Sequence, residues 1–467
     1  MAGTAVTPGS ALDELRGRIR GEVIAEGDPA YPDACRIWNG MIERRPALVV
    51  RCTGAADVCS AVRFAREAGV PVSVRSGGHN VAGTSLSDGG VVVDLTGMRN
   101  VFVDRDRRMV RAAGGARLGD VDHETQAFAL AAPFGVVSKT GIAGLTLNGG
   151  IGFLTRRLGL SCDNLVGADV VTADGRLVHA DLDRNADLLW ALRGGGGSFG
   201  VATSLEYRLH DVGPEVFMAI TFYPLEAGKE GLLAWRDIMR DAPNELMSVA
   251  LYWSAPPEEP FPPEWHGKPV FILAGAWSGP LDEAEEAVRP LRELAEPVAD
   301  LSGPMPFEMA QQLFDAEYPD GRRYYWKSVY LSDVDDVLPE ICDRATAGRP
   351  SPLTSIDVWA LGGAMRDEPE GGSAFAQRQA PFLFGIEANW EGADGDEANL
   401  AWARELYAEA KPLSPTGGTY LNFPGFAEEG EDLLRASYGD KYERLKEVKA
   451  KYDPENVFRG SFSIPVG

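Results

Sequence analysis

Short apolar runs separated by glycine fill the first 210 residues. The segment 55–68 carries its apolar residues at helical spacing and stops at Gly69, so it predicts a helix. Two apolar segments within 168–180 are joined by Asp174-Gly175, a pair that supplies the positive φ angles of a tight hairpin turn. The other runs have the length and β-branched content of strands. These strands are predicted at 46–50, 71–75, 91–95, 100–104 and 109–113.

The pattern changes after residue 210, where longer strand-like runs alternate with helical stretches. This alternation predicts a sheet covered by helices, and hence a second domain of α+β type. From residue 416 the chain returns to glycine-punctuated segments, and a helix at 441–452 is ended by Asp453-Pro454. The predicted divisions are 1–210, 211–415 and 416–467. In the middle part, strands are predicted at 217–223, 246–254 and 269–277, and helices at 225–240, 281–294 and 335–347.

The length and composition are those of a two-domain globular protein. A chain of 467 residues is too long for one compact core, and its 45% apolar and 24% charged content is ordinary. It contains no apolar stretch of about twenty residues, and no apolar core follows a basic start at its N-terminus. We therefore expect no membrane span, no secretory leader, and a cytoplasmic monomer or homodimer.

A formal net charge of −24 narrows the range of partners. A surface this acidic repels nucleic-acid phosphates and anionic lipids. We expect neither nucleic acid nor membrane as a partner, and interpret the excess carboxylates as a solvated surface that maintains solubility.

Cysteine and histidine are few and scattered. No CxxC pair occurs, which argues against a disulfide framework and against a structural zinc site. Neither HxH nor HxxxH spacing occurs, which argues against a histidine metal site. The cysteines are Cys35, Cys52, Cys59, Cys162 and Cys342, and the histidines are His79, His123, His179, His210 and His266.

Glycine is concentrated in segments 75–80, 140–152 and 193–200, and more weakly in 111–119. Glycine lets the backbone approach a ligand closely and leaves amide groups free to point at phosphate oxygens. One such segment alone is better explained as a tight turn, but the first three together indicate a large, phosphate-bearing cofactor. The spacing Gly195-x-Gly197-x-x-Gly200 matches a Rossmann fingerprint, yet it follows a predicted helix and precedes a strand, so we reject that interpretation.

His79 stands inside one of these segments. It follows an apolar strand within a Gly-Gly turn, so its ring is expected to project into whatever the loop encloses. The spacing alone leaves a structural and a functional role equally open.

Several long motifs, in order along the chain, resemble the berberine-bridge-enzyme-like FAD oxidoreductases of the vanillyl-alcohol oxidase/p-cresol methylhydroxylase superfamily. The bacterial members that are linked to their flavin through a single histidine are the most similar in style. The resemblance implies an α+β, two-domain FAD-binding fold. Its FAD domain is built from the first and last chain segments, and its substrate domain has an antiparallel sheet covered by helices. The resembling segments are 75–83, 91–95, 135–165, 188–203, 323–328, 419–423 and 441–458.

The resemblance implies that FAD is bonded to His79 through the flavin 8-methyl carbon. Neutral imidazole is a suitable nucleophile for that bond, which also prevents cofactor loss. Relatives with a second, cysteinyl link have cysteine where this chain has Val137, so attachment through His79 alone is expected. Cys162 lies in a different stretch and is interpreted as a small buried residue.

Other cofactor contacts follow from the same resemblance. The loop that contains His79 is expected to wrap the pyrophosphate, and glycines of 140–152 to back the other side of the cofactor. The implied contact residues are Arg75, Ser76, Gly77, Gly78, Asn80, Ser85, Thr140, Gly141, Gly144, Thr146, Gly149, Gly150, Gly152, Gly200 and Val201.

Candidate catalytic residues come from the later motifs. Tyr420 and Asn422 match a YxN motif, and on a strand both would face one side. The position of the family's glutamate base is Gly385 here, while Glu387 would face the same side two residues on. Glu387 is either a substitute base or a surface carboxylate. Lys327 either orients an anion or is a surface lysine, and Tyr420 is either catalytic or a buried aromatic residue.

The implied function is an FAD-dependent oxidoreductase that takes a hydride from an alcohol, sugar or secondary-metabolite substrate. An oxidase that reduces O2 to H2O2 is favoured, although Thr140 beside the flavin leaves a dehydrogenase open. The missing glutamate, together with Ser461-Phe462-Ser463-Ile464 where relatives often have N-x-N-I, keeps open a flavin-binding protein without redox turnover. The breadth of the family keeps open a flavin-dependent cyclase or isomerase.

Overall fold

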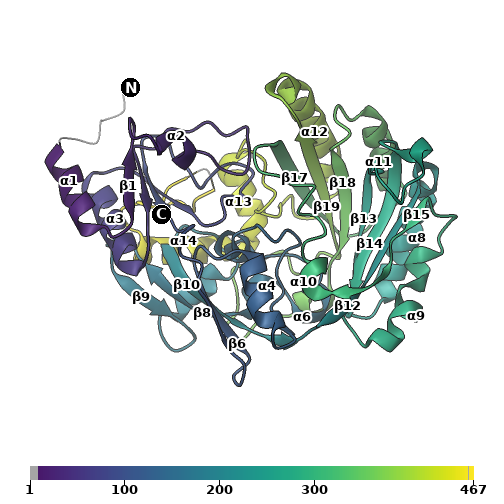
Figure 1. Ribbon diagram of the computed structural model, residues 1–467, viewed down its shortest axis with the longest axis horizontal. Coiled ribbons are helices and arrows are strands. Elements are labelled where there is room, and N and C mark those ends of the chain that lie inside the picture. The colour runs from purple at the N-terminus through teal and green to yellow at the C-terminus, as the bar shows by residue number, and fades with distance from the viewer. Residues whose placement is uncertain (1–8, 461, 467) are drawn as a thin grey trace.

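The computed structural model describes residues 9–460 and 462–466 and has two α+β halves that lie side by side (Figure 1). The first half begins with a four-stranded sheet in the order β1-β2-β4-β3. Strands β2, β4 and β3 are parallel, and α3 (Ala55–Glu67) buries its apolar face against them. The strands are β1 (Glu22–Ala25), β2 (Leu48–Arg51), β3 (Val72–Arg75) and β4 (Val91–Asp94).

A five-stranded antiparallel sheet in the order β5-β6-β10-β8-β9 completes this half. Gly175 sits in the β8–β9 turn with φ of +73°, as the Asp-Gly pair predicts. The glycine-rich segment 193–200 joins α7 (Ala186–Leu192) to β10, an order opposite to that of a Rossmann unit. The strands are β5 (Val101–Asp104), β6 (Met109–Ala113), β8 (Leu165–Val171), β9 (Leu177–Ala180) and β10 (Val201–Arg208).

The C-terminal segment packs against this same half. Helices α13 (Gly430–Tyr438) and α14 (Tyr442–Tyr452) bury Leu434 and Leu445 in the cluster that also contains Leu188 of α7. Further on, the carbonyl of Val457 accepts a 3.0 Å hydrogen bond from the Val72 amide, at the start of β3.

The second half is an antiparallel sheet of eight strands, ordered β15-β12-β14-β13-β18-β19-β17 with β16 beside β12. Strands predicted at 246–254 and 269–277 are confirmed as β13 (Leu246–Ser254) and β14 (Pro269–Trp277). Helices cover one face (Figure 1): α8 (Gly228–Asp241), α9 (Leu281–Arg292), α11 (Val337–Gly348) and α12 (Asp396–Ala410). The other strands are β12 (Glu215–Pro224), β15 (Ala299–Asp300), β16 (Gly303–Pro306), β17 (Arg323–Leu331), β18 (Ser355–Ala360) and β19 (Phe382–Trp390).

The remaining elements are the N-terminal helix and a set of short connecting helices and strands. They are α1 (Gly9–Arg18), α2 (Tyr31–Ala34), α4 (Leu118–Gln126), β7 (Leu130–Ala131), α5 (Ile142–Leu147), α6 (Thr155–Leu158), β11 (His210–Asp211) and α10 (Phe307–Ala310). None of the helices in the described residues is long and apolar enough to cross a membrane.

One predicted strand is wrong. Residues 419–423 form a turn, closed by a 2.7 Å hydrogen bond from the Phe423 amide to the Tyr420 carbonyl. The Thr419 hydroxyl donates to the Ser328 carbonyl, and the Tyr420 amide donates to the Ser328 hydroxyl. Side-chain bonds to a neighbouring strand therefore replace a ladder of backbone bonds here.

Candidate active site

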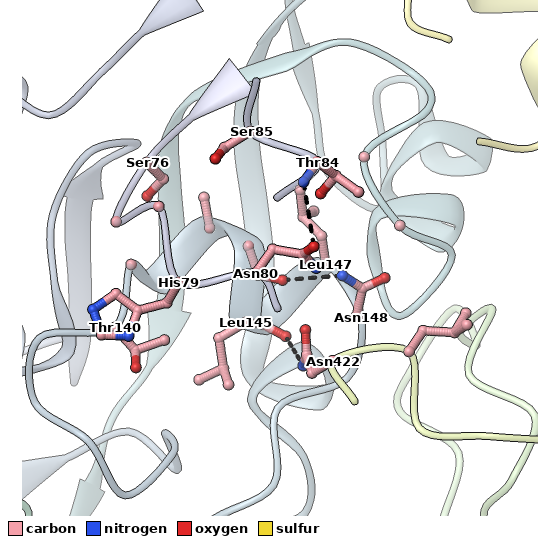
Figure 2. Close-up of a pocket in the computed structure, with 18 of the residues that line it drawn as sticks. Ser76, His79, Asn80, Thr84, Ser85, Thr140, Leu145, Leu147, Asn148 and Asn422 are labelled. Carbon is pink, nitrogen blue, oxygen red and sulfur yellow. Dashed lines mark hydrogen bonds between the residues drawn. The ribbon is translucent and has the colours of Figure 1, made fainter. Parts of the chain in front are cut away.

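A cavity of about 380 Å³ lies between the two halves, within the usual size range of ligand sites. One side is built by the glycine-rich loops of the first half (Figure 2), and the other by the open face of the eight-stranded sheet. Ten of the predicted cofactor-binding residues line it, namely Ser76, Gly77, Gly78, His79, Asn80, Ser85, Thr140, Gly141, Gly144 and Gly200.

The imidazole of His79 lies in the cavity wall and is not hydrogen-bonded to any other described residue. Its ring stacks on Trp38, with centroids 5.0 Å apart and planes 12° apart. Burial, helped by the positive charges of Arg117 and Lys139, lowers the pKa of His79 to about 3. The ring is therefore neutral at physiological pH, and its lone pair is uncommitted.

Trp38 and Asn39 tie this loop to the second half. Trp38 also stacks on Tyr324 of β17, at 3.7 Å between centroids. The buried Asn39 amide donates to the carbonyls of Val81 and Tyr324, at 2.6 and 2.8 Å. The sequence interpretation did not single out either residue. The signal was the polar Asn39 beside a tryptophan in a segment without secondary structure.

The loop side of the cavity is polar and has unmet hydrogen-bonding capacity. The buried hydroxyls of Ser76 and Ser85 have no partner among the described residues. A Cβ on Gly77 would lie 2.3 Å from the Gly141 amide nitrogen, so glycine is required where these two loops meet. Free hydroxyls and closely packed glycine backbone suit a phosphate-bearing ligand such as FAD.

Cysteine is absent from the cavity lining. Val137 lines the cavity, and none of the five cysteines does. Cys162 is fully buried as expected, and burial raises the pKa of its thiol well above the usual value. The lining therefore offers His79 but no thiol.

Six predicted cofactor contacts lie outside the cavity lining and stay predictions. Arg75 is buried in an ion pair with Asp94 and also donates to the Ala34 carbonyl at 2.7 Å. The Thr146 hydroxyl is paired with that of Tyr207 at 2.9 Å. The glycines Gly149, Gly150 and Gly152 allow close packing of the protein on itself, and Val201 is a core residue of β10.

The sheet side of the cavity carries two carboxyl groups. Glu387 of β19 lines it and is only 6% exposed, so the alternative of a surface carboxylate is wrong. Asp357 of β18 lies opposite Gly385 in the strand register, and also lines the cavity. A Cβ on Gly385 would lie 2.2 Å from Asp357 Oδ1. The side chain of Asp357 therefore occupies the space that a larger residue at 385 would take.

The pKa values of both carboxyl groups are raised by their surroundings. Burial raises the pKa of Asp357 to about 7, while burial and then the charge of Asp357 raise that of Glu387 well above its usual value. Tyr318 donates its hydroxyl to Glu387 Oε2 at 2.6 Å, and the Trp359 indole donates to Asp357. Asp357 Oδ1 is buried without a partner among the described residues. The pair can therefore accept and hold a proton.

Tyr420 and Asn422 do line the cavity, although no strand holds them. The Tyr420 hydroxyl oxygen accepts from the Ile151 amide at 3.0 Å and from the Asn422 side chain at 2.8 Å. Asn422 also donates to the Leu145 carbonyl at 3.2 Å (Figure 2). Burial raises the pKa of Tyr420 to about 12, so the phenol keeps its proton and can donate it to a ligand.

Lys327 is removed from the candidate list. It does not line the cavity, because it points to the opposite face of β17 from Trp326, where its ammonium pairs with Glu429 at 2.7 Å. It also lies 4.1 Å from the centroid of the Tyr407 ring. Its exposure of 3% excludes the surface alternative as well. Lys327 is thus a buried structural cation.

The rest of the sheet side is aromatic and aliphatic. Tyr318 and Trp326 meet edge to face at 5.4 Å, as do Trp326 and Phe423 at 5.0 Å. The apolar lining here includes Ile151, Val249, Leu251, Phe314, Trp326, Trp359, Leu383 and Phe423. The described residues contain no group of three or more His, Cys, Asp or Glu that could hold a metal ion.

Comparison with known proteins agrees with this arrangement. Residues 46–181 match the model of an FAD binding domain, and 419–465 match that of a berberine and berberine-like segment. The chain is 34% identical over 460 residues to (R)-6-hydroxynicotine oxidase of Paenarthrobacter nicotinovorans, covering 96% of this chain and 97% of that protein. It is 31% identical over 460 residues to an FAD-linked oxidoreductase of Dictyostelium discoideum, covering 97% of this chain and 96% of that protein. A crystal structure of 6-hydroxy-D-nicotine oxidase from Arthrobacter nicotinovorans has a TM-score of 0.86 at 29% identity, over 99% of this chain and 100% of that chain.

Proposed function

This chain belongs to the berberine-bridge-enzyme-like FAD-linked oxidoreductases, and we propose that it holds FAD covalently through His79 alone and oxidises a small organic molecule, with O2 as the final acceptor. FAD-dependent oxidoreductase activity is common to the relatives it matches. The bond to His79, the absence of a cysteinyl bond, the individual site residues and the acceptor are the proposal.

The observation that carries the proposal is the state of His79. Its ring is neutral, stacked between the cavity and Trp38, and hydrogen-bonded to no other described residue. A structural histidine buried in a protein normally spends its ring nitrogens on hydrogen bonds. An unused nucleophilic nitrogen in a cavity wall suits a residue that bonds to a ligand. Relatives with a second covalent link have cysteine where this chain has Val137. We therefore expect a single covalent bond to the flavin, through His79.

Different residues of this chain are proposed to perform different parts of the reaction. When bound, FAD supplies a two-electron acceptor. Asp357 is proposed to take the N–H or O–H proton of the substrate, and Glu387 to share that proton across the pair. Tyr420 is proposed to donate a hydrogen bond that orients the substrate. The aromatic residues of the sheet exclude water, which strengthens each of these contacts.

The position of Asp357 also bears on the two alternative functions, a flavin-dependent cyclase or isomerase and a flavin-binding protein without redox turnover. Glycine at the position of the family's glutamate is one reason for the alternative of a flavin-binding protein without redox turnover, whereas the cyclase or isomerase rests on the breadth of the family. Because the carboxyl of Asp357 fills the space beside Gly385, an acid is still available at that place in the cavity. The missing glutamate therefore no longer favours a flavin-binding protein without redox turnover.

Acid precipitation of the denatured holoprotein tests the attachment. We expect a yellow pellet from the wild type and from His123→Ala, and a colourless one from His79→Ala. His123 is a matched control because it is an exposed histidine of α4 in the same half. A colourless wild-type pellet, or a yellow His79→Ala pellet, contradicts the proposal. Peroxide formation with a substrate that bleaches the flavin tests the acceptor.

A further inference from the structure

One wall of the cavity is made by two chain segments that lie far apart in the sequence. The first is the glycine segment, residues 196–200, between α7 and β10, and the second is the tail segment, residues 457–460 and 462–464, after α14. Neither of them forms a helix or a strand in the part of the chain that the structure describes, so a backbone ladder does not set their positions. The residues of this wall that line the cavity are Gly196, Gly197, Ser198, Gly200, Phe458, Arg459, Gly460, Phe462 and Ser463.

Lys449 of α14 joins the two segments. Its ammonium donates to the Ser198 carbonyl at 3.0 Å and to the Phe458 carbonyl at 2.8 Å. The third bond goes to Asp453 Oδ2 at 2.5 Å, and both side chains of this ion pair are fully buried. An ammonium has three N–H donors, so all of them are used. One buried cation therefore fixes the glycine segment and the tail segment relative to α14.

Asp453 and Ser198 extend this connection along the tail segment. The Asp453 carboxylate accepts from the amides of Val457 and Phe458, at 2.7 and 2.8 Å. The Ser198 hydroxyl accepts from the Ile464 amide at 3.0 Å. Side chains thus satisfy backbone amides at both ends of the tail segment, where a neighbouring strand would otherwise do so.

Stability alone does not account for the charge of Lys449. Burying an ion pair costs desolvation that hydrophobic residues of similar size avoid, so such a pair adds little to the free energy of unfolding. The pair does define geometry, because its hydrogen bonds are directional and reach backbone groups of both segments. The residues whose positions it defines line the cavity.

The tail segment also brings a positive charge to the cavity. Arg459 lines it, and the guanidinium donates to the carbonyls of Asn456 and Gly69 at 3.1 Å each. It forms no ion pair with a carboxylate of the described residues. A cation in this wall suits the phosphate-bearing cofactor proposed above.

We propose that Lys449 and Ser198 are positioning residues: they hold the glycine segment and the tail segment together as one wall of the cavity, and this wall retains the flavin nucleotide without a covalent bond. The inference rests on the proposed function, because it takes FAD as the ligand of the cavity. It also goes beyond that function, because His79 takes no part in these contacts. The cofactor is thus held in two independent ways, by the bond to His79 and by this wall.

Release of FAD from His79→Ala protein loaded with FAD tests the inference, because only non-covalent contacts hold the cofactor there. The protein is diluted well below its unfolding temperature, and the fluorescence of released FAD is followed. Adding Ser198→Ala removes the acceptor of the Ile464 amide and should speed release about fivefold, equivalent to about 1 kcal/mol. Adding Lys449→Met removes three hydrogen bonds and should speed release at least about 30-fold.

Ser60→Ala and Lys451→Met are the matched controls and should leave the release rate unchanged. The Ser60 hydroxyl donates only to the Ala56 carbonyl of its own helix, α3. Lys451 lies two residues after Lys449 in α14, but its side chain is 57% exposed and pairs with Asp187 outside the cavity lining.

Hydrogen exchange separates a positioning role from a general loss of stability. In Ser198→Ala, exchange should become faster in peptides of the glycine segment and the tail segment together, and stay unchanged in β13 and β14 of the second half. Faster exchange throughout the chain overturns the inference, as does an unchanged release rate in both Ser198→Ala and Lys449→Met. Failure of folded His79→Ala protein to bind added FAD overturns it as well, because the wall would then retain nothing. Ser198→Ala removes one hydrogen bond only, so the test does not depend on the folding of Lys449→Met.

The two proposals fail separately. If the native protein is yellow and its denatured pellet is colourless, covalent attachment falls, and the wild type then serves directly in the release assay. If the pellet is yellow and release from His79→Ala protein is unchanged in both variants, the proposed function stands and the role of the wall falls.

Discussion

Gly385→Ala tests whether the glycine exists to make room for Asp357. The added Cβ would lie 2.2 Å from Asp357 Oδ1, where ordinary contacts begin at 3.4 Å. The carboxyl must move by about 1 Å or more, and overpacking of this kind costs about 1–3 kcal/mol. For a unit of 150–250 residues, 1 kcal/mol lowers Tm by about 2–4 °C, so a loss of about 4–8 °C is expected at 2 kcal/mol.

The assay is a double-mutant cycle read by thermal unfolding. In an Asp357→Ala background the clash is absent, and Gly385→Ala should cost less than about 0.5 kcal/mol. Gly303→Ala in β16 is the matched control, because nothing lies within 4 Å of its added Cβ. Displacement of the base should also slow flavin reduction about 100-fold. Equal destabilisation of both backgrounds by Gly385→Ala, or an unchanged reduction rate, would refute the reasoning.

Four further predictions concern other parts of the site. Trp38→Ala should lower the fraction of protein with acid-stable flavin, while Trp38→Phe keeps it, as the ratio of flavin absorbance to protein in the pellet will show. Arg75→Ala should destabilise the fold by about 1–3 kcal/mol in urea unfolding, because it removes the nearer arginine from buried Asp94 and leaves Arg51 at 3.8 Å, yet spare flavin attachment. Lys327→Met should not alter the rate of flavin reduction in stopped flow, since Lys327 is outside the cavity. The second-order rate constant of flavin reduction should rise as pH increases through about 7, because Asp357 acts as a base in its carboxylate form. The groups around this carboxylate are Glu387, Tyr318 and Trp359. Asp357→Asn should abolish the rise.

Local patterns predicted much of the fold. Apolar runs at 246–254 and 269–277 coincide with β13 and β14, because a central strand buried on both faces is apolar throughout. The loop around His79 was found because glycine and histidine occur together directly after a strand. Lys327 was misassigned, since alternation places it opposite Trp326 but does not say which face meets the cavity.

The features of the site that the sequence did not predict depend on contacts between residues far apart along the chain. Asp357 becomes a partner of Glu387 only when β18 pairs with β19, and nothing near residue 357 announces that pairing. Trp38 reaches His79 through a contact between residues 41 positions apart. Thr419 to Phe423 reads as a strand by composition, but side-chain bonds to Ser328 hold it as a turn.

Mass spectrometry of the tryptic peptide 76–99 tests the central claim most directly. Cleavage after Arg75 and Arg99 releases His79 on a fragment that contains no cysteine and no other histidine. We predict that this peptide carries the flavin, with fragment ions that assign it to His79, and that the peptides of all five cysteines are unmodified. An unmodified 76–99 peptide from yellow holoprotein, or flavin on a cysteine peptide, would contradict the account.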